Sequence, residues 1–297
     1  MSARESPGAR LRAQLAGDDA VVFPGAMNAL IARLIENAGF PGVYMTGAGV
    51  ANGLLGQPDV GLTTLTEMAQ AAQNMCAAVD VPVVADADTG FGGSANVERT
   101  VELYERAGVA AIQLEDQMVP KRCGHFEGKE VVSIDEMLAR LRAAQAARRD
   151  PDLMIIARTD ARSVLGLDES IRRGLAYAEV GADALFIEAP ADDDELKRVG
   201  SELAKTGIPL LANMVEGGKT PLHSAAELAE FGLKFVIFPG LLSRITVRAV
   251  TGALEVLADG GDSRPLMDRL APFDEVQSIL ELDQLNARVA SYESEGQ

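Results

Sequence analysis

The fold of this chain is most constrained by a regular alternation of short apolar runs with longer amphipathic segments. Each run has the length and composition of a buried strand, and a helix-like segment separates it from the next. Strands separated by helices pair in parallel, so eight such units without a linker predict one closed (β/α)8 barrel of the TIM type. A doubly wound open α/β sheet is the alternative. The predicted strands are Ala20–Phe23, Val43–Met45, Val83–Ala85, Ala110–Leu114, Leu153–Ala157, Ala184–Ile187, Pro209–Ala212 and Phe235–Phe238.

The predicted helices share a common ending. Asn28–Asn37 has apolar residues at helical spacing and stops at Gly39, which is a good C-terminal cap. Tripeptides that end in Gly108, Gly181 and Gly232 close the segments before three later strands in the same way. This weak internal repeat supports the division into strand–helix units.

The C-terminal part of the chain carries more apolar residues than an exposed tail can hold. Residues 1–297 are predicted to form one α/β-barrel domain, of which 258–297 is a C-terminal helical extension. Within it, Phe273–Ser294 has helical spacing and a large apolar face, so we expect this helix to pack on a neighbouring subunit. The residues of this face are Val276, Ile279, Leu280, Leu282 and Leu285.

Polar residues gather where the apolar runs end. In the stretch 81–128, one run leads into Asp86 and Asp88, and the next leads into Glu115 and Asp116. Packing does not explain this pattern, because an unpaired buried charge is unfavourable by several kcal/mol. In a barrel the carboxyl ends of the strands converge on one face, so we predict an active site there; solvated loop charges are the alternative. The polar residues at the ends of different strands are Thr46, Asp86, Asp88, Glu115, Arg158, Glu188 and Asn213.

Composition excludes several classes of function. The formal net charge is -17, which repels a phosphate backbone, so no nucleic-acid partner is expected. No apolar stretch is long enough to cross a membrane, and no secretory signal is present, so no membrane partner and a cytoplasmic location are predicted. The two cysteines, Cys76 and Cys123, form no disulfide framework, and the two histidines are too few for a His-rich site. Any metal is therefore expected to bind through oxygen.

Two motifs identify a family resemblance. Segments 86–92 (Asp-Ala-Asp-Thr-Gly-Phe-Gly) and 121–125 (Lys-Arg-Cys-Gly-His) resemble the isocitrate lyase/phosphoenolpyruvate mutase superfamily. The resemblance implies an α/β barrel, magnesium dependence, an α-oxo- or 2-hydroxy-carboxylate substrate, and homotetramers that exchange their eighth helices. It extends over nearly the whole chain through the segments Tyr44–Gly49, Glu115–Gln117, Ala157–Asp160, Glu188–Pro190 and Asn213–Gly218.

The loop sequence discriminates between reactions within the superfamily. Lys-Arg-Cys-Gly-His is similar to carbon–carbon lyases of the 2-methylisocitrate and 2,3-dimethylmalate type, and the Lys-x-Asn-Ser loop of phosphonate-forming mutases is absent. This implies retro-aldol cleavage of a 2-hydroxy di- or tricarboxylate to a pyruvate-like oxo acid and a carboxylate. The alternatives are an oxaloacetate hydrolase or decarboxylase, and a mutase-type enzyme such as a carboxyvinyl-carboxyphosphonate phosphorylmutase. A non-catalytic metabolite-binding barrel is a more distant alternative.

The resemblance also implies a role for each site residue. The expected ligands of Mg²⁺, or of Mn²⁺ in its place, are Asp86, Asp88 and Glu115, with Asp86 as the first choice. Hard carboxylate oxygens suit this ion, which usually keeps several waters. Asp88 could instead be an N-cap or turn aspartate.

Cys123 is the expected acid that protonates the departing carbanion. Lys121, Arg122 and His125 should lower the pKa of its thiol from about 8.5 towards the operating pH, and Cys76 is expected to be a core residue. The other predicted catalytic residues are Tyr44, as base or orienting group, Arg158 and Glu188. Arg158 could also be a structural ion-pair partner. The predicted substrate-binding residues are Thr46, Gly47, Ala48, Asp59, Lys121, Arg122, Gly124, His125 and Asn213; many family members have Ser-Gly-Gly at residues 46–48.

Overall fold

The computed structural model describes residues 5–17, 19–119, 121 and 128–294. In this part of the chain, eight parallel strands close into a barrel in sequence order. The predicted barrel is confirmed, and the open sheet is excluded because the first strand is hydrogen-bonded to the last. The strands are β1 (Val21–Ala26), β2 (Val43–Met45), β3 (Val83–Asp86), β4 (Ala111–Glu115), β5 (Met154–Thr159), β6 (Ala184–Ile187), β7 (Leu210–Asn213) and β8 (Phe235–Phe238).

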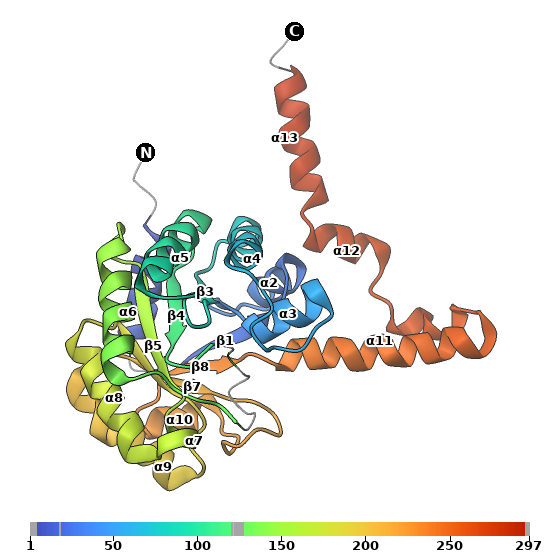
Figure 1. Ribbon diagram of the computed structural model, residues 1–297. Coiled ribbons are helices and arrows are strands. Elements are labelled where there is room, and N and C mark those ends of the chain that lie inside the picture. The colour runs from blue at the N-terminus through green and yellow to red at the C-terminus, as the bar shows by residue number, and fades with distance from the viewer. Residues whose placement is uncertain (1–4, 18, 120, 122–127, 295–297) are drawn as a thin grey trace. The chain divides into compact units, whose positions relative to one another are not determined.

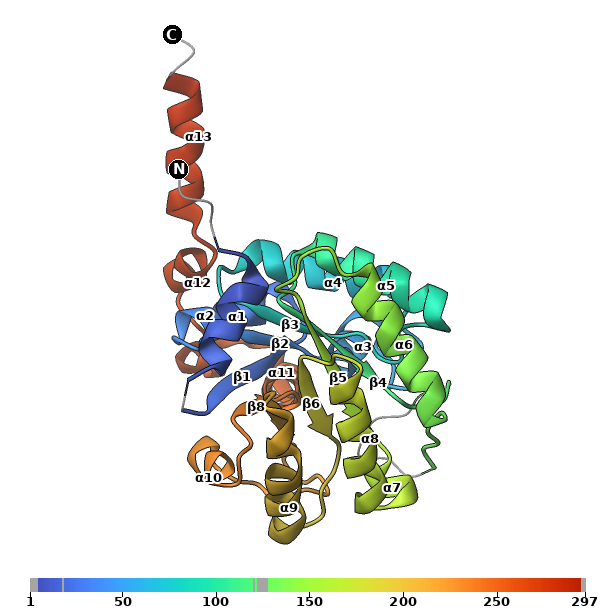
Figure 2. The same cartoon turned by 90° about the vertical axis from the view of Figure 1, so that its left-hand side faces the viewer.

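Helices cover the outside of the barrel, as Figures 1 and 2 show. Their apolar faces pack on the outward-facing side chains of the strands, and Met68, Tyr104 and Leu141 are fully buried in this core. Gly108 adopts the left-handed conformation, with φ 91°, at the end of α5, as expected of a glycine cap. The helices are α2 (Ala29–Asn37), α3 (Gly47–Leu55), α4 (Leu65–Ala78), α5 (Ser94–Ala107), α6 (Ile134–Ala147), α7 (Arg162–Leu165), α8 (Leu167–Glu179), α9 (Asp193–Leu203) and α10 (Ala225–Glu230), with the 3-10 helix η1 (Ala204–Thr206).

The interior of the barrel changes from apolar to charged along the strands. Successive side chains of a strand point to opposite faces, so alternate residues line the interior. In β4, Ala111 lies in the apolar interior cluster, and Gln113 and Glu115 continue the same face towards the carboxyl end. Leu11 and Leu15 of α1 (Pro7–Leu15) belong to the same apolar cluster. Packing therefore fills the barrel, and the polar side chains collect at its carboxyl end.

A short helix, α3, follows β2 directly. The side chain of Thr46 caps this helix, and Gly56 ends it in the left-handed conformation with φ 62°. These cap residues stabilise a short helix in a glycine-rich sequence.

The chain divides into two compact units, Met1–Ser243 and Arg244–Gln297. The helix predicted over Phe273–Ser294 is interrupted at Glu281, where φ is 57°. None of the described helices in the chain is long and apolar enough to cross a membrane. The helices of the second unit are α11 (Leu241–Gly260, which begins in the first unit), η2 (Arg264–Arg269), α12 (Phe273–Ile279) and α13 (Leu282–Ser294).

Candidate active site

The amino-terminal end of α3 lies against the acidic residues at the end of β3. The hydroxyl of Thr46 accepts a hydrogen bond from Gly49 N at 3.2 Å. A Cβ atom on Gly47 would lie 2.6 Å from Asp86 Oδ2 and 3.3 Å from Asp88 Oδ1. Only glycine allows the backbone to come this close to the two carboxylates. The first N–H groups of a helix have no helical partner, so Gly47 and the half-buried Ala48 can supply donors to a carboxylate.

The three predicted metal ligands come together at adjacent strand ends, and all three are buried. Asp88 N donates to Asp86 Oδ1 at 3.0 Å. This turn holds Asp88 in the left-handed region, with φ 48°, which aspartate tolerates better than most residues. Glu115 N donates to Asp88 O at 2.9 Å, so Glu115 lies beside the pair.

Lys121 brings a positive charge to this cluster. Its Nζ lies 2.6 Å from Asp88 Oδ1 and also pairs with Asp59. Burial lowers the pKa of Lys121, but the surrounding carboxylates, Asp88 first, outweigh burial and raise it well above its ordinary value. Burial raises the pKa of Asp88 to about 6, against the opposing effect of Lys121. The predicted substrate-binding residues Asp59 and Lys121 thus lie with the acidic cluster.

Glu115 is the least satisfied acid of the cluster. Arg158 Nη1 lies 3.3 Å from its Oε2, but its Oε1 is buried with no hydrogen-bond partner in the part of the chain that the structure describes. Burial raises the pKa of Glu115 well above its ordinary value, and Arg158 offsets this only in part. Buried polar atoms without a partner are uncommon, so this oxygen marks a position suited to a ligand.

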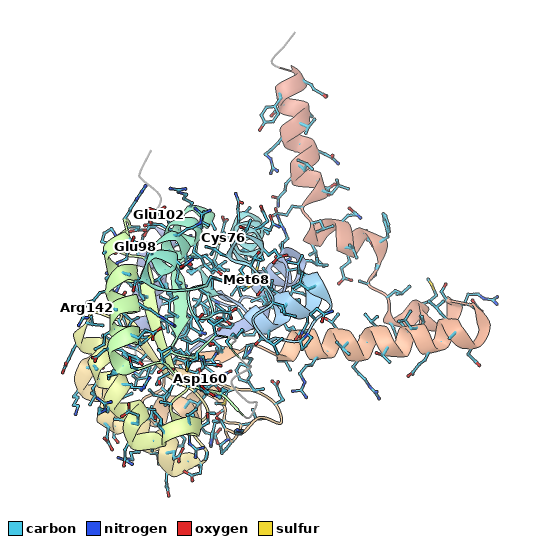
Figure 3. The ribbon with its side chains drawn as sticks, viewed as in Figure 1. Met68, Cys76, Glu98, Glu102, Arg142 and Asp160 are labelled. Atoms are coloured by element: carbon cyan, nitrogen blue, oxygen red, sulfur yellow. The ribbon has the colours of Figure 1, made fainter. Side chains whose placement is uncertain are left out.

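Arg158 is held by three carboxylates and an aromatic ring. Its Nε and Nη2 donate to the two oxygens of Asp160, at 2.9 and 3.2 Å. Nη2 also lies 3.5 Å from Glu188 Oε2, and the guanidinium carbon lies 5.1 Å from the centroid of the Phe186 ring. Burial lowers the pKa of Arg158, but the carboxylates, Asp160 first, raise it well above its ordinary value. Figure 3 marks Asp160 inside the barrel unit.

Asn213 extends the site from β7. Its Nδ2 donates to Glu188 Oε2 at 3.2 Å, which fixes the amide. Its buried Oδ1 has no hydrogen-bond partner within the described residues, so it can accept a hydrogen bond from a ligand. The structure thus brings Arg158, Glu188 and Asn213 together, as the sequence predicts.

Tyr44 is joined to the acidic cluster through a glutamine that the sequence did not single out. Tyr44 OH donates to Gln113 Oε1 at 2.9 Å, and Gln113 Nε2 donates to Asp86 Oδ1 at 3.4 Å. Burial raises the pKa of Tyr44 well above its ordinary value, so the hydroxyl keeps its proton. This geometry favours the orienting role of Tyr44 over the role of a base. A polar residue inside the apolar run 110–114 was the signal that could have found Gln113.

The loop residues Arg122, Cys123, Gly124 and His125 lie outside the described residues, and their roles stay predictions. Beyond this loop, Lys129 is buried and its Nζ lies 2.6 Å from Asp160 Oδ1. The sequence did not assign Lys129 or Asp160 to the site, although Asp160 belongs to a quoted motif.

The donor set fits a hard divalent cation. Asp86, Asp88 and Glu115 offer only oxygen, Glu115 Oε1 lacks a partner, and Gly47 leaves space beside Asp86. Within the described residues, no group of three or more His, Cys, Asp or Glu side chains is already arranged to hold a metal ion. Mg²⁺ is usually bound through one or two carboxylates and completes its shell with water and substrate.

The fold and the site define a class: a (β/α)8-barrel enzyme with its chemistry at the carboxyl ends of the strands. A family model described as phosphoenolpyruvate phosphomutase matches residues 11–258, and the chain belongs to this family, within the PEP mutase/isocitrate lyase superfamily.

Individual relatives differ in their reactions. The chain is 46% identical over 277 residues to 2,3-dimethylmalate lyase of Eubacterium barkeri, which covers 93% of this chain and 95% of that one. A solved structure of oxaloacetate acetylhydrolase with 3,3-difluorooxalacetate has a TM-score of 0.91 and 37% identity, covering 96% of this chain and 97% of that one. Phosphonopyruvate hydrolase with oxalate and Mg²⁺ has a TM-score of 0.87 and 30% identity, covering 97% and 99%.

Proposed function

We propose that this protein is a magnesium-dependent carbon–carbon lyase that cleaves a 2-hydroxy di- or tricarboxylate of the 2-methylisocitrate or 2,3-dimethylmalate type. The observation that carries the proposal is the buried acidic cluster of Asp86, Asp88 and Glu115 beside Arg158, in which Glu115 Oε1 has no hydrogen-bond partner within the described residues. The 46% identity to a 2,3-dimethylmalate lyase supports the same reaction class.

Asp86, Asp88 and Glu115 would hold the metal, directly or through water. When bound, Mg²⁺, or Mn²⁺ in its place, supplies a Lewis acid that polarises and orients the C–O group of the substrate. Gln113 donates to Asp86 and receives a hydrogen bond from Tyr44, so both residues orient the first-choice ligand. Outer partners of this kind tune a metal site.

The carboxylate of the substrate would be bound between α3 and β5. The hydroxyl of Thr46 and the backbone N–H groups of Gly47 and Ala48 lie at a helix amino-terminus, which favours an anion. Arg158 adds a charge-assisted contact. Asn213 and Glu188 continue this surface on the next strands. The remaining predicted contacts, from Asp59, Lys121, Arg122, Gly124 and His125, would surround the departing part of the substrate.

The cleavage step conserves atoms and electrons as a retro-aldol reaction. A general base takes the hydroxyl proton, the oxygen forms a C=O bond, the carbon–carbon bond breaks, and its electron pair stays on the departing carbon. The fragment that carried the hydroxyl becomes the α-oxo acid, and the departing carbanion takes a proton from the thiol of Cys123. An ordinary thiol is a far stronger acid near neutral pH than a serine hydroxyl, which suits it to this step.

A second candidate activity is hydrolytic cleavage of oxaloacetate. The similarity to a solved structure of oxaloacetate acetylhydrolase, with a TM-score of 0.91 and 37% identity, supports this candidate. Both activities would use the same metal and carboxylate contacts, so they are distinguished by which substrate the protein cleaves faster.

A product assay with a substrate panel tests the proposal. Purified protein with Mg²⁺ should release an α-oxo acid from a 2-alkylmalate or from 2-methylisocitrate, with much lower activity on oxaloacetate, and excess chelator should abolish turnover. Asp86→Ala should also abolish it, whereas Asp194→Asn, which removes the same charge from an exposed position, should not. Undiminished turnover in chelator contradicts the metal assignment, and preference for oxaloacetate selects the second candidate.

The role of Cys123 has its own test. Cys123→Ser should lower kcat by about 10²–10⁴-fold, the usual contribution of a positioned acid, while metal binding is retained. Cys76→Ser is the matched control and should leave kcat near that of the wild type. If Cys123→Ser cleaved the best substrate at a near-normal rate, the thiol would not be the acid.

The second unit supports an assembled state. We infer a homotetramer with exchanged C-terminal helices, because α11 has no buried residue and exposes several large apolar side chains. Light scattering should report a mass about four times that of the 31.3 kDa chain, and a stable monomer would contradict the inference. We also place the protein in the cytoplasm, which localisation of a tagged full chain checks. The exposed apolar residues of α11 are Ile245, Val247, Val250, Leu254 and Leu257.

A further inference from the structure

One carboxylate of the site, Asp160, is shared by two buried cations. Arg158 donates to both of its oxygens, at 2.9 and 3.2 Å, and Lys129 Nζ lies 2.6 Å from Oδ1. All three side chains are more than nine-tenths buried, with exposed fractions of 9% for Arg158, 1% for Lys129 and 0% for Asp160. A buried ion group of this kind is held only when each charge keeps its partner, because an uncompensated charge is strongly unfavourable.

The contact with Asp160 determines which part of Arg158 can reach a ligand. Asp160 occupies the edge of the guanidinium formed by Nε and Nη2, and the ring of Phe186 lies against its carbon. Nη1 of Arg158 faces the acidic cluster, where it lies 3.3 Å from Glu115 Oε2. A planar guanidinium fixed on one edge presents the other edge in a defined direction.

Asp160 is hydrogen-bonded to Asp116, and so is Val132, in the segment that follows Lys129. The backbone N–H of Asp160 donates to Asp116 Oδ1 at 2.9 Å. Val132 N donates to Asp116 O at 2.8 Å, and Met118 N donates to Glu130 O at 2.9 Å, which fixes the backbone next to Lys129. These backbone contacts hold Asp160 and the segment next to Lys129 in place without a ligand.

We propose that Lys129 and Asp160 are positioning residues that hold Arg158 in the orientation that binds the substrate carboxylate. Lys129 fixes the rotation of the Asp160 carboxylate, so that its two oxygens meet Nε and Nη2 of Arg158. Neither residue touches the substrate itself. The inference rests on the proposed function, in which Arg158 binds the carboxylate.

Oxalate, a small planar dicarboxylate, is the probe. Its Kd is measured by calorimetry with excess Mg²⁺ on the full chain, together with kcat and KM for the best substrate and the melting temperature. Lys129→Met and Asp160→Asn should each raise the Kd for oxalate on the order of 10- to 10²-fold, as expected when a binding group is misplaced. Lys129→Gln, which keeps an N–H donor, and Lys129→Arg should recover part of the loss.

A non-additivity test separates positioning from general loss of charge or structure. In an Arg158→Met background, Lys129→Met should cause little further loss, because its effect passes through Arg158. Arg162→Met is the charge control: Arg162 follows shortly after Asp160 but pairs with Glu195, at 2.7 Å, and the variant should bind oxalate as the wild type does.

The outcomes distinguish this inference from the proposed function. If Arg158→Met binds oxalate normally, the carboxylate assignment in the proposed function fails, and this inference fails with it. If Arg158→Met binds oxalate weakly but folded Lys129→Met and Asp160→Asn bind it normally, only the positioning role is overturned. The same holds if the effects of the Lys129 and Arg158 substitutions on oxalate binding add fully. Should Lys129→Met not fold, Lys129→Gln and Asp160→Asn decide by the same criteria.

Discussion

Glu115 and Asp116 are adjacent carboxylates at the end of one strand, yet their surroundings are opposite. Asp116 Oδ2 accepts hydrogen bonds from Thr159 Oγ1 at 2.6 Å and from Arg173 Nη1 and Tyr177 OH, both at 2.8 Å. Its Oδ1 accepts from a backbone N–H, so both oxygens are satisfied. Glu115 has one distant ion pair and, in the described residues, an oxygen without a partner.

The difference separates a structural acid from an acid kept for a ligand. Period-two geometry turns Glu115 into the barrel and Asp116 towards α8, where Arg173 and Tyr177 lie. A carboxylate whose oxygens all accept hydrogen bonds stabilises the folded state. A carboxylate with an oxygen that has no partner can still bind a ligand through that oxygen. Each of the following predictions tests one side of this contrast.

Glu115→Gln should give the largest loss of activity. The amide keeps the shape of the side chain but loses the negative charge, so kcat/KM should fall by about 10³-fold, as for loss of a major electrostatic contact. The free energy of unfolding should change by only about 1 kcal/mol, because few hydrogen bonds are lost. Steady-state kinetics and urea unfolding measure the two effects. A large loss of stability with normal kcat/KM would show that Glu115 is structural.

Asp116→Asn should give the reverse result. It removes the charge that compensates buried Arg173, which keeps Glu169 as a second partner at 2.9 Å. We expect the free energy of unfolding to fall by about 3 kcal/mol, at the lower end of the range for a broken buried ion pair. Because the folded site is retained, Kd for Mn²⁺ at low temperature should stay close to that of the wild type. If Asp116→Asn left the free energy of unfolding unchanged but abolished Mn²⁺ binding, Asp116 would be the ligand-binding acid and not the structural one.

The two thiols should show a smaller version of the same contrast. Burial raises the pKa of Cys76 to about 12, so almost no thiolate exists at neutral pH. A thiol reagent should label native protein at Cys123 quickly and at Cys76 only after denaturation, with Cys76→Ser as control. Figure 3 places Cys76 on α4, away from Asp160. Cys76 is partly buried and packs against the core, so equal labelling rates in native protein would contradict its protection there.

The raised pKa of Cys76 also sets a pH dependence of stability. The folded state disfavours the thiolate, so this contribution is fully present below the unfolded pKa of about 8.5 and is lost as pH rises towards the folded value of about 12. Cys76→Ala should therefore lose less stability than the wild type between these pH values. Urea unfolding across this range measures the difference, and parallel pH profiles would contradict it.

The sequence predicted the barrel because each strand and helix is a local pattern. It also predicted which polar residues converge, since the carboxyl ends of parallel strands share one face. It could not distinguish Glu115 from Asp116, because the partners of each come from distant elements, Arg173 from α8 and Arg158 from β5. Gln113 and Lys129 were missed for the same reason: their importance lies in contacts to Asp86 and Asp160 that only the closed barrel creates.

The metal-binding role of the cluster of Asp86, Asp88 and Glu115 is tested most directly by titrating Mn²⁺ into the full chain, with oxalate present, and following the free ion by electron paramagnetic resonance. The wild type should bind one Mn²⁺ per chain. Asp86→Ala should weaken this binding by at least about tenfold, the scale expected for loss of a metal contact, while the exposed variant Asp194→Asn should bind as the wild type does. Equal binding by wild type and Asp86→Ala, or no binding by the wild type, would contradict the assignment of these carboxylates to a metal.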